Sequence, residues 1–162
     1  MSMDLNEMPV IERRRIEALV LGPVIRAFQE EFGEERTNEL VRKVMVGIAT
    51  EQGRELAERV KGENLQEFAD SKGAWRKNGA LETVEIEKKP DVYQFDVTRC
   101  RYAEMYNEIG YGDLGGILSC ARDFGFSEGF NPKINLQRDH TIMAGDGFCD
   151  FRYDLPVRKA SK

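Results

Sequence analysis

The chain has 162 residues, of which 41% are hydrophobic and 33% are charged. This composition is typical of one ordinary globular domain with a sizeable core, and it excludes a disordered or collagen-like chain. The net charge of −5 repels phosphate backbones, and the short basic clusters are flanked by glutamates, so no nucleic-acid partner is expected.

A secretion signal is not evident in the first 20 residues, and the apolar stretches are too short to span a bilayer. We therefore expect a cytoplasmic protein with no membrane partner. The three cysteines, Cys100, Cys120 and Cys149, are an odd number at wide spacings. That pattern predicts free thiols rather than a disulfide framework.

The first half of the chain is predicted to be helical because its apolar residues recur at helical spacing. Pro9 suits the first turn of a helix that ends at Gly33, and Gly22-Pro23 should kink or split that helix. A second helix is expected from about residue 35 to residue 61.

A short third helix can be capped by Asn64. The two long helices carry broad apolar stripes with charged flanks, which either form an internal core or join copies of the chain. We expect a homodimer or larger homo-oligomer that uses these stripes.

A β-hairpin is predicted where the apolar pattern changes to alternation, near Thr83. After a turn at residues 89–91, its second strand carries Tyr93, Phe95 and Val97 on one face.

Helical pieces are then expected around residues 102–109 and 114–126. A third strand at 134–143 and a fourth strand at 149–153 should form a second hairpin around the turn at 145–147.

The order of these elements predicts an α+β fold, in which N-terminal helices precede a four-stranded antiparallel sheet with helices packed on one side. Residues 1–162 should form a single domain, with a helical part at about 8–76 and a sheet with helices at about 81–155. Disorder is expected at residues 1–7 and in the tail at 156–162.

Familiar catalytic motifs are missing from the sequence, which has no phosphate-binding loop, dinucleotide fingerprint, nucleophile elbow or paired-cysteine zinc spacing. We therefore expect no cofactor. The single histidine, His140, excludes a histidine-rich zinc site but leaves open a mixed site of cysteines and His140.

The pair Cys120 and Asp123 is a candidate site, because residues three apart on a predicted helix are neighbours on one face. An acid beside a thiol could position a substrate or move a proton. Alternatively, Cys120 is a small core residue and Asp123 a surface charge.

The predicted third strand places Arg138 and His140 on the same face as apolar residues. If that face points inward, the two form a polar island in which Arg138 could hold a substrate carboxylate. Alternatively, the strand ends near Arg138 and leaves both in water. On the fourth strand, Cys149 and Asp150 should lie on opposite faces, so at least one of them is structural.

Four segments of the second half resemble the L-2-amino-thiazoline-4-carboxylic acid hydrolase family. They are FDVTRCRYAEMY at 95–106, LSCARD at 118–123, GFNP at 129–132 and TIMAGDGFCDFRY at 141–153. The resemblance covers residues 92–153, and the helical first half agrees in layout.

This resemblance implies a small-molecule substrate, a five-membered cyclic isothiourea with a carboxylate that water opens to N-carbamoyl-L-cysteine. The reaction needs a group to hold the carboxylate, for which Arg138 or Arg99 is a candidate. Asp123 could activate water, and His140 or a cysteine could protonate the departing sulfur. A covalent route through Cys120 or Cys100 remains open, if a neighbouring group lowers the thiol pKa.

The end of the sequence is also similar to the small-molecule-binding vinyl reductase domain. Thr141 stands where that domain usually has the first cysteine of a pair. A non-catalytic small-molecule-binding module is therefore the alternative function, and a structural zinc site of cysteines with His140 is a third.

Overall fold

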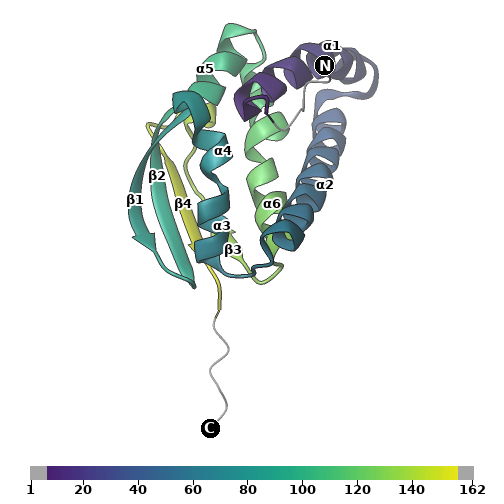
Figure 1. The fold of residues 1–162 in the computed structure, drawn as a ribbon. Helices are drawn as coiled ribbons and strands as arrows, with labels where there is room; N and C mark the ends of the chain where they lie inside the picture. The colour runs from purple at the N-terminus through teal and green to yellow at the C-terminus, as the bar shows by residue number, and fades with distance from the viewer. Residues whose placement is uncertain (1–6, 157–162) are drawn as a thin grey trace.

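The computed structural model describes residues 7–156, which form an α+β fold with a sheet in one layer and helices against one of its faces (Figure 1). The expected fold class is confirmed. The main elements in chain order are α1 (Val10–Phe32), α2 (Glu34–Val60), α3 (Leu65–Ser71), α4 (Gly73–Arg76), β1 (Leu81–Lys88), β2 (Val92–Cys100), α5 (Arg101–Glu108), α6 (Arg122–Phe130), β3 (Asn135–Gln137) and β4 (Cys149–Asp154).

The two long helices α1 and α2 begin and end close to their predicted positions. Gly33, with a φ of 90°, separates them in a backbone conformation that favours glycine. Pro23 lies inside α1, so the proline does not split this helix. Within residues 7–156, none of the helices has the length and apolarity that a membrane crossing requires.

A capping box begins the short helix α3, as the sequence predicted for Asn64. The Asn64 side chain accepts a hydrogen bond from the backbone N–H of Glu67 at 3.0 Å, and the Glu67 carboxylate accepts one from the backbone N–H of Asn64 at 3.1 Å. The helix therefore starts at a fixed place, and its last turn delivers Lys72 to the space beneath the sheet.

The sheet has the strand order β1-β2-β4-β3, with every neighbouring pair antiparallel. The first hairpin pairs β1 with β2, and Phe95 of β2 lies opposite Phe151 of β4. Alternate residues of the two central strands are buried against the helices. Tyr93 and Tyr153 are among the most completely buried of these side chains.

The third strand is shorter than predicted. It ends at Gln137, so the strand expected at 134–143 was wrong beyond that residue. The backbone N–H groups of Asp139 and His140 instead donate to Oδ1 of Asp150, at 3.1 and 2.6 Å. The Asp150 carboxylate accepts the hydrogen bonds that the backbone of β4 would otherwise accept, so the chain leaves the sheet after β3.

The helical run predicted at 114–126 is divided. A π-helical segment, η3 (Gly116–Cys120), precedes α6, and such segments frequently occur at functional sites. Helix α6 lies against α2 (Figure 1). A side chain at Gly125 or Gly129 would overlap the α2 backbone at Val46 or Thr50, so these glycines permit the close approach.

The expectation of disorder concerns residues 1–7 and 156–162. Apart from residues 7 and 156 themselves, these lie outside the described residues.

Candidate functional site

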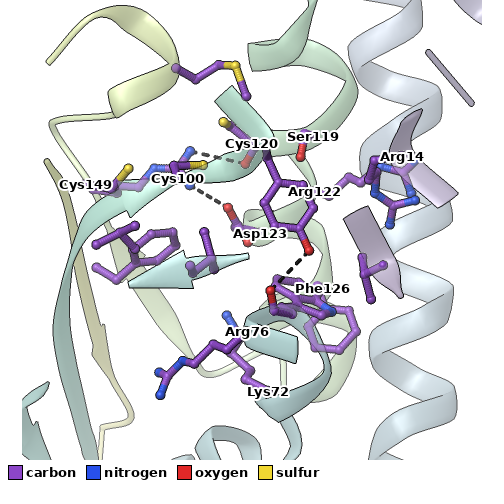
Figure 2. Close-up of a pocket in the computed structure, with 18 of the residues that line it drawn as sticks. Arg14, Lys72, Arg76, Cys100, Ser119, Cys120, Arg122, Asp123, Phe126 and Cys149 are labelled. Carbon is purple, nitrogen blue, oxygen red and sulfur yellow. Dashed lines mark hydrogen bonds and ion pairs between the residues drawn. The ribbon is translucent and has the colours of Figure 1, made fainter. Parts of the chain in front are cut away.

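A cavity of about 90 Å³ lies between the inner face of the sheet and the helices (Figure 2). Side chains from β2 and β4 line one wall, and η3, α6 and the long helices line another. Apolar side chains such as Phe95, Val97 and Trp75 cover much of the surface, while charged groups and thiols enter from several elements. A largely apolar cavity with a few polar groups is the usual form of a small-molecule site.

Four of the six predicted site residues line this one cavity. They are Cys100, Cys120, Asp123 and Arg138, and Cys149 joins them. These residues are brought together because η3 and α6 pass under the ends of β2 and β4. Figure 2 shows the three cysteines toward one end of the cavity, with Asp123 between them and Lys72.

Asp123 forms a buried ion pair with Arg138. The Arg138 Nη1 donates to the Asp123 carboxylate at 2.6 Å. The Arg138 side chain is 6% exposed and the Asp123 side chain is 13% exposed. Arg138 also donates to the Cys120 carbonyl at 3.2 Å, whereas its buried Nε has no hydrogen-bond partner in the described part of the chain. Asp123 is therefore held in one orientation by Arg138.

The three thiols are protonated at neutral pH. Burial, with a smaller contribution from the negative charge of Asp123, raises the pKa of Cys100 to about 11 and that of Cys120 to about 12. Burial raises the pKa of Cys149 as well. A nucleophilic cysteine needs the opposite shift, so these surroundings do not activate a thiol.

His140 lies outside the cavity, as expected of the alternative in which the strand ends near Arg138, although Arg138 itself is buried. Its side chain is 50% exposed, stacks on Phe148 and has Nδ1 3.3 Å from the Asp150 carboxylate, which raises the pKa of the imidazole. The physical reason is the early end of β3, which turns the chain toward solvent after Arg138. Protonation of a ligand in the cavity by His140 is therefore not supported.

Arg99 also lies on the surface, where its guanidinium pairs with Glu104 at 2.8 Å and Glu82 at 3.4 Å. It does not line the cavity, so the suggested carboxylate contact from Arg99 is not available there.

The mixed zinc site is not formed either. Among residues 7–156, no three His, Cys, Asp or Glu side chains are placed to hold a metal ion, and His140 is separate from the cavity that the cysteines line.

Sequence reasoning missed Lys72, which is 5% exposed and lines the cavity. Its Nζ donates to the Tyr153 hydroxyl at 2.6 Å and lies 4.6 to 4.8 Å from the ring centroids of Phe68, Trp75 and Tyr153. Burial lowers the pKa of this amine to about 8. A lysine at the end of a short helix ordinarily lies in solvent. The available signal was its spacing, because Lys72 follows Leu65, Phe68 and Ala69 at helical intervals and so shares their buried face.

Fold and cavity together define an α+β protein with an internal, largely apolar cavity. The family model for L-2-amino-thiazoline-4-carboxylic acid hydrolase matches residues 13–153, and the chain belongs to this family. No curated protein matches the chain.

Two solved structures share the fold at low sequence identity. One is the phenol-responsive sensory domain of the transcription activator PoxR with phenol, with a TM-score of 0.55 and 12% identity over 84% of this chain and 73% of that chain. The other is trafficking protein particle complex subunit 3 from Naegleria fowleri, covalently bound to palmitic acid, with a TM-score of 0.53 and 10% identity over 90% of this chain and 96% of that one.

Proposed function

We propose that this protein is a hydrolase that opens a small cyclic carboxylate, such as L-2-amino-thiazoline-4-carboxylate, to N-carbamoyl-L-cysteine inside the cavity. Family membership supports the reaction class. The observation that carries the proposal is a single carboxylate, Asp123, fixed by Arg138 in a mostly apolar cavity beside three neutral thiols.

The size of the cavity suits this substrate. Its volume of about 90 Å³ holds roughly six to nine water-sized groups. The thiazoline carboxylate has about nine non-hydrogen atoms, which is the upper end of that range. Palmitic acid, bound to the trafficking subunit, is about twice as large and would not fit without expansion of the cavity.

In the proposed reaction, water adds to the ring carbon between nitrogen and sulfur, and the bond from that carbon to sulfur then breaks. The carbon becomes the carbonyl of the carbamoyl group. One proton of the water ends on the ring nitrogen and the other on the departing sulfur. Asp123 would accept a proton from the attacking water and return it to the sulfur, acting first as base and then as acid.

The remaining groups would position the ring. Arg138 would hold Asp123 against the ring through its hydrogen bond to that carboxylate. Cys100 and Cys120 would contact the sulfur end as neutral thiols, because their raised pKa values disfavour a covalent intermediate.

The direct test is incubation of the purified protein with L-2-amino-thiazoline-4-carboxylate, followed by chromatography and mass spectrometry of the product. We expect N-carbamoyl-L-cysteine to accumulate in proportion to enzyme and time. Saturable binding without product would reject the hydrolase.

A non-catalytic binding module is the second candidate function, and the mainly apolar wall of the cavity favours it. The PoxR domain, which shares the fold, was determined with phenol, a ligand of about seven non-hydrogen atoms that would fit here. Calorimetric binding of phenol, together with no turnover of the thiazoline, would support this alternative.

We also propose that two copies of the chain associate through α1 and α2. These helices expose large apolar side chains, each at least 41% accessible, and a groove lies between the helices. A symmetric dimer brings this face against its own copy and buries both. The exposed residues are Ile16, Leu19, Val20, Val24, Phe28, Phe32, Leu40, Val44 and Ile48.

A further inference from the structure

The cavity contains more positive than negative charge. Among residues 7–156, five cationic side chains line it against one carboxylate, that of Asp123, and three of the five already have carboxylate partners. Arg14 and Arg122 both bond to Glu17, at 2.7 and 2.9 Å, and Arg138 bonds to Asp123. Lys72 and Arg76 are the remaining two.

Neither of these two cations contacts a carboxylate in the described part of the chain. Arg76 donates to the Tyr93 hydroxyl, and its guanidinium lies over the Phe95 ring at 5.3 Å. In Figure 2 the Arg76 side chain extends away from Asp123. Lys72 is therefore the fully buried cation of the cavity that has no counter-ion.

The surroundings of Lys72 stabilise a cation incompletely. The ring faces of Phe68, Trp75 and Tyr153 attract an ammonium group, and the Tyr153 hydroxyl accepts one hydrogen bond. An ammonium has three donors, and a buried charge remains costly until an anion pairs with it. A carboxylate in the cavity would supply both the acceptors and the charge.

We propose that Lys72 binds the carboxylate of the ligand, which makes this site selective for small cyclic monoanions over neutral rings of the same shape. The inference rests on the proposed function for the identity of the ring. Binding of the carboxylate by Lys72 would also orient the thiazoline, because the ring carbon that reacts and the ring sulfur lie across the ring from the carboxylate. Figure 2 places the cysteines toward the opposite end of the cavity from Lys72, with Asp123 between them, where those atoms would lie.

The affinity of the cavity for a carboxylate should then fall as the pH rises. The groups that face Lys72 are Tyr153 from β4, Asp123 from α6, Arg138 from the segment after β3, and Arg76 from α4. Burial is the largest cause that lowers the pKa of Lys72, to about 8, so the free protein carries the ammonium below that pH. A carboxylate binds the protonated form, and its affinity should therefore fall about tenfold per pH unit above pH 8 until the higher pKa of the complex is reached.

The test uses thiophene-3-carboxylate and thiophene-3-carboxamide as probes. Both are five-membered sulfur rings that water does not open, and neither titrates between pH 6 and 10, roughly. Calorimetry would measure both probes with the wild type, with Lys72→Met, and with Lys77→Met as the control. Lys77 is an exposed lysine that does not line the cavity.

We expect the wild type to bind the carboxylate about tenfold or more tightly than the carboxamide, as for a charged hydrogen bond. Lys72→Met should bring the two affinities together, while Lys77→Met should change neither. Methionine suits an aromatic surrounding, and retained carboxamide binding would show that the cavity is intact.

Equal carboxylate affinity in Lys72→Met and the wild type would overturn the inference, and so would a wild type that binds neither probe. The proposed hydrolase fails separately. Lys72-dependent binding of the thiophene carboxylate without turnover of the thiazoline would reject the enzyme and leave this anion site in place.

Discussion

Asp123→Asn is the sharpest perturbation of the proposed reaction, because it removes the acid with little change in shape. Turnover should fall by about 10² or more, as for a lost general base. The variant should also lose stability, because the change leaves the buried charge of Arg138 without its carboxylate partner. The amide oxygen can still accept one hydrogen bond, so we expect a loss of about 2 kcal/mol in the free energy of unfolding.

A second variant separates the two effects. Asp123→Asn combined with Arg138→Gln removes both charges of the pair, and replacing a whole buried pair is often neutral for stability. The free energy of unfolding of the double variant should therefore lie within about 1 kcal/mol of the wild-type value. Turnover should stay low, because the base is still missing.

The assays are denaturant unfolding and the rate at which N-carbamoyl-L-cysteine appears from saturating thiazoline. Recovery of turnover together with stability in the double variant would refute the reasoning, because Asp123 would then act only through folding. Near-normal turnover in the single variant would also remove this aspartate from the mechanism.

Three further predictions concern the thiols and the assembly. Cys149→Ala should lower the free energy of unfolding by about 1 kcal/mol and change turnover little, because it removes a buried side chain whose sulfur accepts a hydrogen bond from the Ile142 N–H at 3.3 Å. An inactive but fully stable variant would contradict this. Thiol titration of the denatured, unreduced protein should find all three cysteines, whereas a single thiol would reveal a disulfide. Light scattering should give about twice the chain mass of 18.5 kDa. Val44→Glu should shift the protein to a monomer, whereas the control Val84→Glu, at an equally exposed valine of β1, should not. A wild-type monomer at micromolar concentration would exclude the dimer.

The elements that could be predicted from sequence are those that local forces specify. The hairpin β1–β2 follows from alternating apolar residues around a proline turn, and α3 follows from the cap at Asn64. The pairing of Cys120 with Asp123 at one site was also suggested by their spacing of three. These features need no information from distant parts of the chain.

The third strand was predicted too long because its end is set by a more distant group. The third strand ends early because the carboxylate of Asp150, ten or eleven residues away, accepts the backbone hydrogen bonds of residues 139 and 140. His140 is exposed for the same reason, although its parity matched that of Arg138. The strand pattern could not show that a side chain would displace a strand.

The sequence by itself determined the fold class and the resemblance to the hydrolase family, because periodicity and motifs are properties of neighbouring residues. It also predicted that the three cysteines are free thiols. Only the tertiary structure decided which chemical groups meet. Lys72 becomes a buried cation because Tyr153, 81 residues away, accepts its hydrogen bond on the inner face of the sheet. Arg138 and Asp123 form a buried ion pair because β3, which ends just before Arg138, lies against α6. Burial among groups from separate elements sets the charge of the cavity, and no local pattern encodes it.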